Sequence, residues 1–434
     1  MKNSRIILSG KTKNMLTDNM VPIIFIAFTL LGFAVARGVP MSFFLTELSG
    51  RFYRNGFLVL SLIIPVVAGL GLNFGIVVGA MSAQLALIIV RYFFIEGFGG
   101  LLLCFALSTP LAAFFGYLTG KLYNKTRGQE MIASLIVGFF ANGIYQFLLL
   151  FAVGVIIPVP ATHPMIKTDG VGVRMTVDMG SLKYSLESVF EVPFVWAVLV
   201  VSVLFLAYML YKHLKAKQMP LAAASDKFSF ASMAALVLCI AISIVSIVTN
   251  NSLMTVKKIP VLTIVLIAML AVFTKLIMKT KLGQDFRSVG QSQHIAQTNG
   301  IDVDKTRIIA VIISTVLAAW GQLIYLQNMG TLNTYGAHNQ IGMFSVAALL
   351  VGGASVSKAT VKHAFAGTLL FNSMFIMSPE IGQALFGQAI LGEYFRTFMV
   401  YGVIGLALGL YVWNANRKAG LTLDPDTVET RTSI

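Results

Sequence analysis

The stretch Lys281-Leu-Gly-Gln-Asp-Phe-Arg-Ser-Val-Gly-Gln-Ser-Gln-His-Ile-Ala-Gln-Thr-Asn-Gly-Ile-Asp-Val-Asp-Lys-Thr-Arg307 is a long polar run between two apolar segments. Glycines punctuate it at Gly283, Gly290 and Gly300, and a short amphipathic piece lies between the last two. We expect residues 291–298 to form about two turns of helix that stop at Gly300, because glycine readily adopts the left-handed conformation of a helix C-terminus. A short helix held between glycines has the form of a docking element.

The residues after this short helix are expected to begin the next apolar segment. Asp302 or Asp304 could cap its first turn through a side-chain oxygen. Lys305 and Arg307 follow directly, and basic residues at the end of a span usually lie among lipid headgroups. The stretch therefore predicts a membrane-surface loop, residues 279–306, that leads into a capped helix.

The composition is that of a protein embedded in lipid. Of the 434 residues 57% are hydrophobic and only 11% are charged, whereas soluble domains have about 25% charged residues. In a bilayer, helices satisfy all their backbone groups internally, so we expect an all-α, polytopic helical bundle. Cys104 and Cys239 both lie in apolar runs, which argues against a disulfide framework or a cysteine metal site. The net charge of +15 is spread over short loops, so we expect no nucleic-acid partner.

The apolar runs predict about 10 to 12 transmembrane segments in a domain covering residues 20–413, with some segments short, broken or re-entrant. A retained first span follows a basic tail, residues 1–19, that is expected in the cytoplasm, as is the tail at 414–434. Residues 40–55 are expected to lie at the outer interface and residues 156–192 to form an external loop. The expected spans are 20–39, a pair within 57–90 that is broken near Asn73, 98–119, 131–155, 193–212, 228–249, 259–278, 307–327, 341–353, 360–378 and 394–413.

Motifs for enzymatic chemistry are not evident. The run from Gly352 to Lys358 lacks the Gly-Lys-Ser/Thr ending of a phosphate-binding loop, and neither a His-Glu-x-x-His nor a Gly-x-Ser-x-Gly pattern occurs. We therefore expect no catalytic, cofactor-binding or metal-binding residue. The histidines lie in loops or near helix ends, where solvated side chains are expected: His163, His213, His294, His338 and His363.

Polar groups inside the expected spans are amides and hydroxyls, with almost no acids. Ion-driven carriers usually bury acidic residues in the bundle, so the pattern argues against a secondary transporter, although Na⁺ binding by backbone carbonyls stays open. Neutral hydrogen-bonding groups suit a path for a polar, uncharged solute. The alternative is that they bond helices together, at about 0.6 kcal/mol each. The candidates are Asn73, Gln84, Asn142, Gln146, Ser314, Gln322 and Asn372.

The stretch from Gly283 to Val303 resembles the cytoplasmic coupling loop of ABC-importer permeases of the branched-chain amino acid/ribose/nucleoside superfamily. That loop runs approximately Gly-x-x-x-Arg-Ala-Val-Gly-x-Asn-x-x-Ala-Ala-x-x-x-Gly-Ile-x-Val. The segment from Phe344 to Ser355 looks like the family's second-half Gly-Gly motif, and 71–75 matches its Gly/Asn break less closely. This chain departs from the pattern at Ser288, Ser292 and Ile295.

The resemblance implies a permease subunit in the bacterial cytoplasmic (inner) membrane, in contact with lipid, with both termini inside. It implies a second permease subunit, two ATPase subunits that bind ATP, an extracytoplasmic solute-binding protein and a small-molecule solute. The Gly-Gly-Ala-Ser motif favours simple sugars or nucleosides over branched-chain amino acids. An ion-coupled carrier and a membrane enzyme are the alternatives. Coupling to the ATPase is assigned to Arg287, Gly290, Gln291, His294, Ala296, Gly300 and Asp302.

Overall fold

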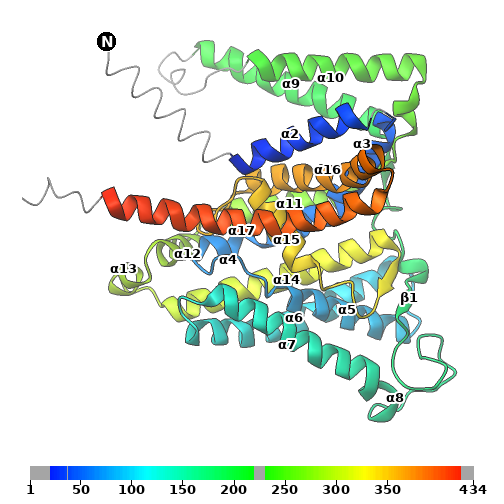
Figure 1. The fold of residues 1–434 in the computed structure, drawn as a ribbon, viewed down its shortest axis with the longest axis vertical. Coiled ribbons are helices and arrows are strands. Elements are labelled where there is room, and N and C mark those ends of the chain that lie inside the picture. Colours follow the sequence, from blue (N-terminus) through cyan, green and yellow to red (C-terminus); the bar gives the residue numbers. More distant parts are fainter. Residues whose placement is uncertain (1–19, 37, 219–229, 422–434) are drawn as a thin grey trace, which may run out of the picture.

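The computed structural model describes residues 20–36, 38–218 and 230–421. The predicted tail 1–19 and most of the predicted tail 414–434 lie outside the described residues, as does part of the basic loop after residue 212. The described chain is a bundle of long helices, which confirms the all-α, polytopic class (Figure 1). Six of its helices are long and apolar enough to cross a membrane, or seven if a pair bent by 75° is one span, and four apolar helices are shorter.

The first half of the bundle contains α2 (Met20–Val35), α3 (Met41–Ser61), α4 (Ile63–Val67), α5 (Ile76–Tyr92), α6 (Gly97–Lys125) and α7 (Glu130–Phe147). A π-helical turn (Leu148–Ala152) and α8 (Val153–Val155) extend α7. Then come β1 (Thr176–Asp178), a 3-10 turn (Gly180–Leu182), β2 (Glu191–Val192), α9 (Phe194–Gln218) and α10 (Phe230–Thr249).

The second half begins with a 3-10 turn (Ser252–Thr255), β3 (Ile259–Pro260) and α11 (Val261–Ile277). The predicted docking loop contains α12 (Lys281–Gln291) and α13 (Gln293–Thr298). The chain continues through α14 (Val303–Met329), β4 (Thr331–Asn333), α15 (Ile341–Val351), α16 (Val361–Phe386) and α17 (Ala389–Leu421).

Helix α14 is the central element, with neighbours α3, α5 and α6 around it. Small residues permit this close packing: a Cβ added at Gly79 of α5 would lie 2.2 Å from the carbonyl oxygen of Thr315 on α14. In a bilayer, helices associate through such close contacts and through hydrogen bonds, because lipid is as apolar as leucine. Ser314 of α14 supplies one such bond, donating to the carbonyl of Ser61 at 3.0 Å.

Residues 40–55 do not form the expected outer interfacial segment. They belong to the first part of a 27-residue helical span, Met41–Val67, which includes α3 and α4. Its polar residues repeat with a helical spacing, so they gather on one side while apolar residues such as Phe44 and Phe57 are buried. Arg51 and Arg54, expected at the interface because of this aromatic and basic composition, lie instead within a helix that is a candidate membrane span.

The predicted break between two spans is confirmed between α4 and α5. Gly69 and Gly71 have φ values of +75° and +68°, a backbone conformation that residues with side chains rarely adopt. The break is a turn between two helices, and Gly69 lies against Gly290 of α12. It therefore belongs to the same end of the bundle as α12 and α13.

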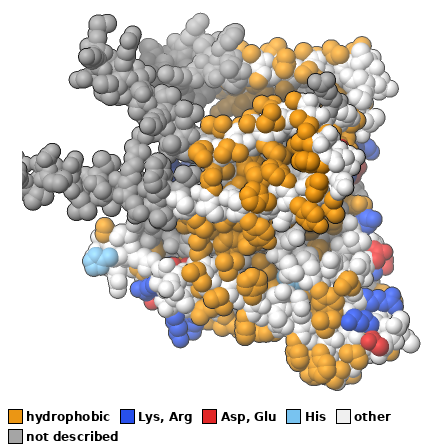
Figure 2. All heavy atoms as spheres, in the orientation of Figure 1, with side chains coloured by type: hydrophobic (Ala, Val, Ile, Leu, Met, Phe, Trp, Pro, Cys, Tyr) orange, Lys and Arg blue, Asp and Glu red, His pale blue; other side chains and the backbone are white. Residues whose placement is uncertain are grey.

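The two ends of the bundle differ. Helices α12 and α13 lie at the left in Figure 1, where α2 begins and α17 ends, whereas α8 and β1 lie at the right. The expected external segment folds against the bundle through antiparallel pairs, β1 with β4 and β2 with β3. Figure 2 shows hydrophobic side chains across the middle of one face and charged side chains toward its two ends, the distribution expected of a spanning bundle.

Candidate functional site

The predicted docking loop is a pair of capped helices. Thr280 accepts a hydrogen bond from the Gly283 amide at 3.4 Å and begins α12, which the sequence did not predict as a helix. Ser292 accepts from the Ile295 amide at 3.3 Å and begins α13, two residues after the expected start. Gly300, with φ +78°, follows the end of α13 as predicted. The expected cap at Asp302 is confirmed, since its carboxylate accepts from the Lys305 amide at 3.0 Å.

A small apolar core holds α12 and α13 to the start of α14. Val289, Ala296 and Val303 are buried together, and Ile301 packs against them. Ala296 is fully buried, so its methyl group serves this core and is not available to a partner. The two helices thus form one unit with the end of α14.

Gly290 lets this unit approach the bundle closely. A Cβ at Gly290 would lie 2.1 Å from the carbonyl oxygen of Val67, and a Cβ at Gly69 would lie 2.7 Å from the Gly290 Cα. Real Cβ atoms do not make such contacts, so glycine is required at both positions. Helix α12 therefore touches the end of α4 backbone to backbone.

The outer surface of the unit is polar with one apolar side chain. Five of the seven residues predicted for coupling are exposed: Arg287, Gln291, His294, Gly300 and Asp302. Ile295 is also 61% exposed, next to His294. From the sequence, Ile295 was noted only as a departure from the family pattern. An isoleucine among the polar residues Gln293, His294 and Gln297 is the signal that could have identified it as a contact residue.

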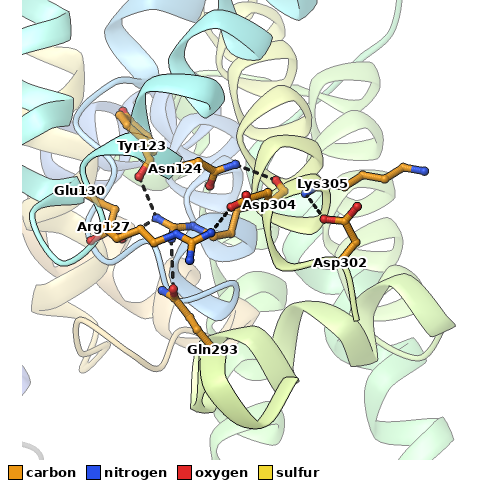
Figure 3. A network of polar contacts seen from close by, with 9 residues as sticks. Tyr123, Asn124, Arg127, Glu130, Gln293, Asp302, Asp304 and Lys305 are labelled. Carbon is orange, nitrogen blue, oxygen red and sulfur yellow. Dashed lines mark hydrogen bonds and ion pairs between the residues drawn. The ribbon is translucent and has the colours of Figure 1, made fainter. Parts of the chain in front are cut away.

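A buried ion pair joins this unit to the α6–α7 hairpin (Figure 3). Arg307 was expected at the headgroups, but it is fully buried. Its guanidinium donates to the Glu130 carboxylate, to the Tyr123 carbonyl at 3.2 Å and to Gln293 Oε1 at 3.3 Å. Gln293 belongs to α13, so one side chain connects α6, α7, α13 and α14.

A second, exposed ion pair lies beside the first. Arg127 contacts Asp304, and about half of each side chain is exposed. Asn124 adds a hydrogen bond from its amide to the Asp304 carbonyl at 2.9 Å. Exposed pairs contribute about 0.2–1 kcal/mol, whereas breaking a buried pair costs about 3–5 kcal/mol, so the Arg307–Glu130 pair is the stronger connection.

Three of the predicted path residues meet in a buried network. The ring nitrogens of His338 lie 2.9 Å from Gln84 Oε1 and 2.8 Å from Asn142 Oδ1. Tyr145 donates to Gln84 at 2.9 Å, and Gln146 donates to Asn142 at 3.2 Å. The expectation that His338 is solvated is wrong, because it is fully buried. Burial lowers the pKa of His338, which lies between β4 and α15, so its ring is neutral near pH 7.

The other predicted path residues lie apart from this network. Asn73 is buried near the α12 end. Its side-chain oxygen Oδ1 accepts hydrogen bonds from the Tyr123 hydroxyl at 2.9 Å and from the Gly75 amide at 3.0 Å. Gln322 donates to the Ala337 carbonyl at 3.5 Å. These contacts hold helices and turns together, which was the alternative reading of such residues. Asn372 alone among the predicted residues lines the cavity described next.

A cavity of about 370 Å³ lies between α3, α14, α15, α16 and α17. Its polar lining includes Asn55 and Asn372, which hydrogen bond at 3.3 Å, and three arginines that were not among the predicted site residues. The lining residues are Arg51, Arg54, Asn55, Leu58, Val59, Tyr325, Met329, Gly336, Ala337, Gln340, Ile341, Phe344, Ser345, Ala348, Phe371, Asn372, Phe375 and Arg396.

The fold defines a class: a polytopic helical membrane protein with a cavity among its helices and a capped helical unit, α12–α13, at one end. Residues 44–408 match the family described as "Branched-chain amino acid transport system / permease component", and the chain belongs to that family. The family is one of transport permeases rather than of enzymes. The predicted resemblance is confirmed.

Two curated proteins are similar over shorter regions. The chain is 32% identical over 112 residues, 26% of this chain and 33% of the relative, to the "Probable ABC transporter permease protein YphD" of Escherichia coli (strain K12). It is 29% identical over 161 residues, 37% of this chain and 40% of the relative, to the "Xylose transport system permease protein XylH" of Haemophilus influenzae (strain ATCC 51907 / DSM 11121 / KW20 / Rd). No solved structure gives a significant match.

Proposed function

We propose that this chain is the transmembrane permease subunit of an ATP-binding-cassette importer for a sugar or a sugar-containing solute such as a nucleoside. Family membership and the names of the two similar proteins support the class of transporter and solute. A branched-chain amino acid remains the second candidate, because the family's own description names it.

The observation that carries the proposal is the α12–α13 unit. It exposes Ile295 beside polar side chains, it has its own small core, and it is joined to α4 by Gly290 and to α6–α7 by Arg307. A docking element has to be both accessible and firmly linked to the helices that move. The energy source would be ATP bound by partner subunits, with no cofactor in this chain.

The rest of the assembly follows from this assignment. We place residues 279–306 and both termini in the cytoplasm of a bacterial cell, next to two ATPase subunits, and residues 156–192 outside, next to a solute-binding protein. A second permease subunit, the same or a related chain, would complete the path through the inner membrane. The basic residues near the α12–α13 end, among them Lys121, Lys125 and Arg127, support this orientation.

The test is whether the tagged full-length chain, purified from the cells that naturally express it, carries an ATPase subunit with it. Ile295→Glu is expected to abolish co-purification, since it places a charge in an apolar contact. Thr298→Glu, at another exposed position of α13, serves as the matched control. Retention of the ATPase by the Ile295 variant would remove α13 from its assigned role. Failure of the unaltered chain to capture any ATPase would contradict the proposed class.

A further inference from the structure

The cavity between α3 and α14–α17 has an unusual charge. Its lining includes Arg51, Arg54 and Arg396 and no aspartate or glutamate. Arginine side chains within a membrane-spanning bundle are costly, and they generally face the bundle interior or a water-filled space where they serve function. Three arginines around one cavity therefore indicate that the cavity binds a ligand that pairs with them.

Two of the three arginines have carboxylate partners near the cavity. Arg51 Nε lies 3.5 Å from Glu47, and Arg396 Nη2 lies 3.3 Å from Glu393. Both glutamates are more exposed than their partners, with 37% and 52% of their side chains accessible. These pairs offset part of the charge but use only a fraction of the donors that each guanidinium presents.

Arg54 is the arginine without a carboxylate. Within the described residues no acidic oxygen lies within 4 Å of it, and its one hydrogen-bond partner is the Met329 sulfur, at 2.8 Å from Nη1. A thioether sulfur is a weak acceptor, so this contact neutralises nothing. The Nε atom of Arg54 is buried and has no hydrogen-bond partner, whereas the Arg51 Nε has only its ion-pair contact with Glu47. Three cations and two carboxylates leave the cavity with one excess positive charge and unused donors.

The aromatic side chains complete the arrangement. The Arg51 and Arg396 guanidiniums lie 5.9 Å and 4.4 Å from the centre of the Phe375 ring, which holds them in place without neutralising them. Phe344 and Phe371 pack around the same ring. The paired amides of Asn55 and Asn372 lie on the wall and offer hydrogen bonds of the kind that hydroxyl groups accept and donate.

We propose that the cavity takes an oxyanion-bearing sugar, a small polyol body that carries a carboxylate or a phosphate group. The inference rests on the proposed importer function and narrows its solute. Arginine presents a planar fork of donors that matches carboxylate and phosphate oxygens, and such charge-assisted bonds are the strong ones. Arg54 supplies the uncompensated charge, the Nη groups of Arg51 add further donors, and the two asparagines contact the hydroxyl groups. The expectation of an uncharged solute, drawn from amides alone, is revised accordingly.

The test compares matched pairs of neutral and anionic probes. The full-length chain in nanodiscs is heated with D-xylose or D-xylonate, and with D-ribose or ribose 5-phosphate, and its unfolding temperature is recorded at a series of probe concentrations. We expect the anionic member of at least one pair to stabilise the chain more than its neutral partner. The carboxylate and phosphate arms show which oxyanion the cavity prefers.

The variant Arg54→Gln tests whether the anion binds in this cavity. Arg54→Gln is expected to weaken the apparent affinity for the preferred anion by about tenfold, equivalent to about 1.4 kcal/mol, and to leave the response to the neutral probe unchanged. Lys125→Gln, which removes a charge from an exposed position of α6 at the opposite end, is expected to change neither response.

Three results would overturn the proposal: no stabilisation by either anion, equal stabilisation by both members of each pair, or an anion preference that survives Arg54→Gln. Each would mean that Arg51 and Arg396 serve only the packing of α3 and α17 on Phe375 of α16, with their charges balanced by glutamates of their own helices. Co-purification with the ATPase is measured separately, so a negative result with the anions would contradict the proposed solute and leave the proposed importer function unaffected.

Discussion

Comparing Glu130→Ala with Asp304→Ala should distinguish the stability contribution of the buried ion pair from that of the exposed pair beside it. Glu130→Ala leaves the Arg307 guanidinium fully buried with only the Tyr123 carbonyl and Gln293 Oε1 as partners. Removing one partner of a buried pair costs about 3–5 kcal/mol, because the other charge stays buried. Asp304→Ala removes the carboxylate of the half-exposed pair with Arg127 and should cost about 0.2–1 kcal/mol.

The assay is the free energy of unfolding of the purified chain in detergent, with transport measured in parallel. The double variant Glu130→Leu and Arg307→Met should recover much of the lost stability, since replacing a buried ion pair by apolar groups is often neutral or favourable. Transport should nevertheless stay low, because the double variant has lost the hydrogen bond to Gln293 of α13.

Two outcomes would refute this reasoning. If Glu130→Ala and Asp304→Ala destabilise equally, the Arg307 pair is not shielded from water as its burial indicates. If the double variant regains both stability and transport, the pair is a structural contact and takes no part in coupling.

Three further substitutions address other contacts. Gly290→Val should lower the free energy of unfolding by about 1–3 kcal/mol and reduce transport per ATP hydrolysed, because the valine side chain would displace α12 from Val67. Gly138→Val, which has open space around it, is the control and should change neither quantity. His338→Ala should lower the free energy of unfolding by about 1 kcal/mol, measured in detergent, since it removes the buried hydrogen bond that the neutral ring donates. Glu187→Ala, which removes a buried partner of Lys257 and Asn328, should speed proteolytic cleavage within residues 156–192; an unchanged rate would show that β-pairing alone holds the segment.

Local signals in the sequence predicted the parts of the coupling site that depend on neighbouring residues. The cap at Asp302 and the stop near Gly300 are determined within one turn of helix, so residue type and spacing sufficed to predict them. The close approach of Gly290 to Val67 depends on two segments more than 200 residues apart in the chain, and only the fold shows it. The sequence identified Gly290 as important through family resemblance, but it gave no physical reason.

The errors share one cause, which is that a charged or aromatic residue was assigned to the nearest aqueous surface. Arg307 follows the docking loop and was therefore expected among the lipid headgroups, yet its ion pair with Glu130 from a distant segment allows it to be buried. Arg51 and Arg54 lie among aromatic residues and read as interfacial, yet they extend into a cavity made by four other helices. His338 was expected to be a solvated loop histidine, yet it is buried with its ring nitrogens facing Gln84 and Asn142. A partner that is remote in sequence decides each case.

Two continuous helical elements connect the cavity with the docking unit. The span Met41–Val67 carries Arg51 and Arg54 on the cavity wall, and the carbonyl of its last residue contacts Gly290 of α12. From Arg54 to Val67 is about 20 Å along the helix axis, at about 1.5 Å per residue. Helix α14 carries Tyr325 to the cavity and begins beside α13, which its Arg307 contacts. Packed helices move as rigid units rather than bending continuously, so a displacement of α12 and α13 by a docked ATPase would reach both walls of the cavity at once.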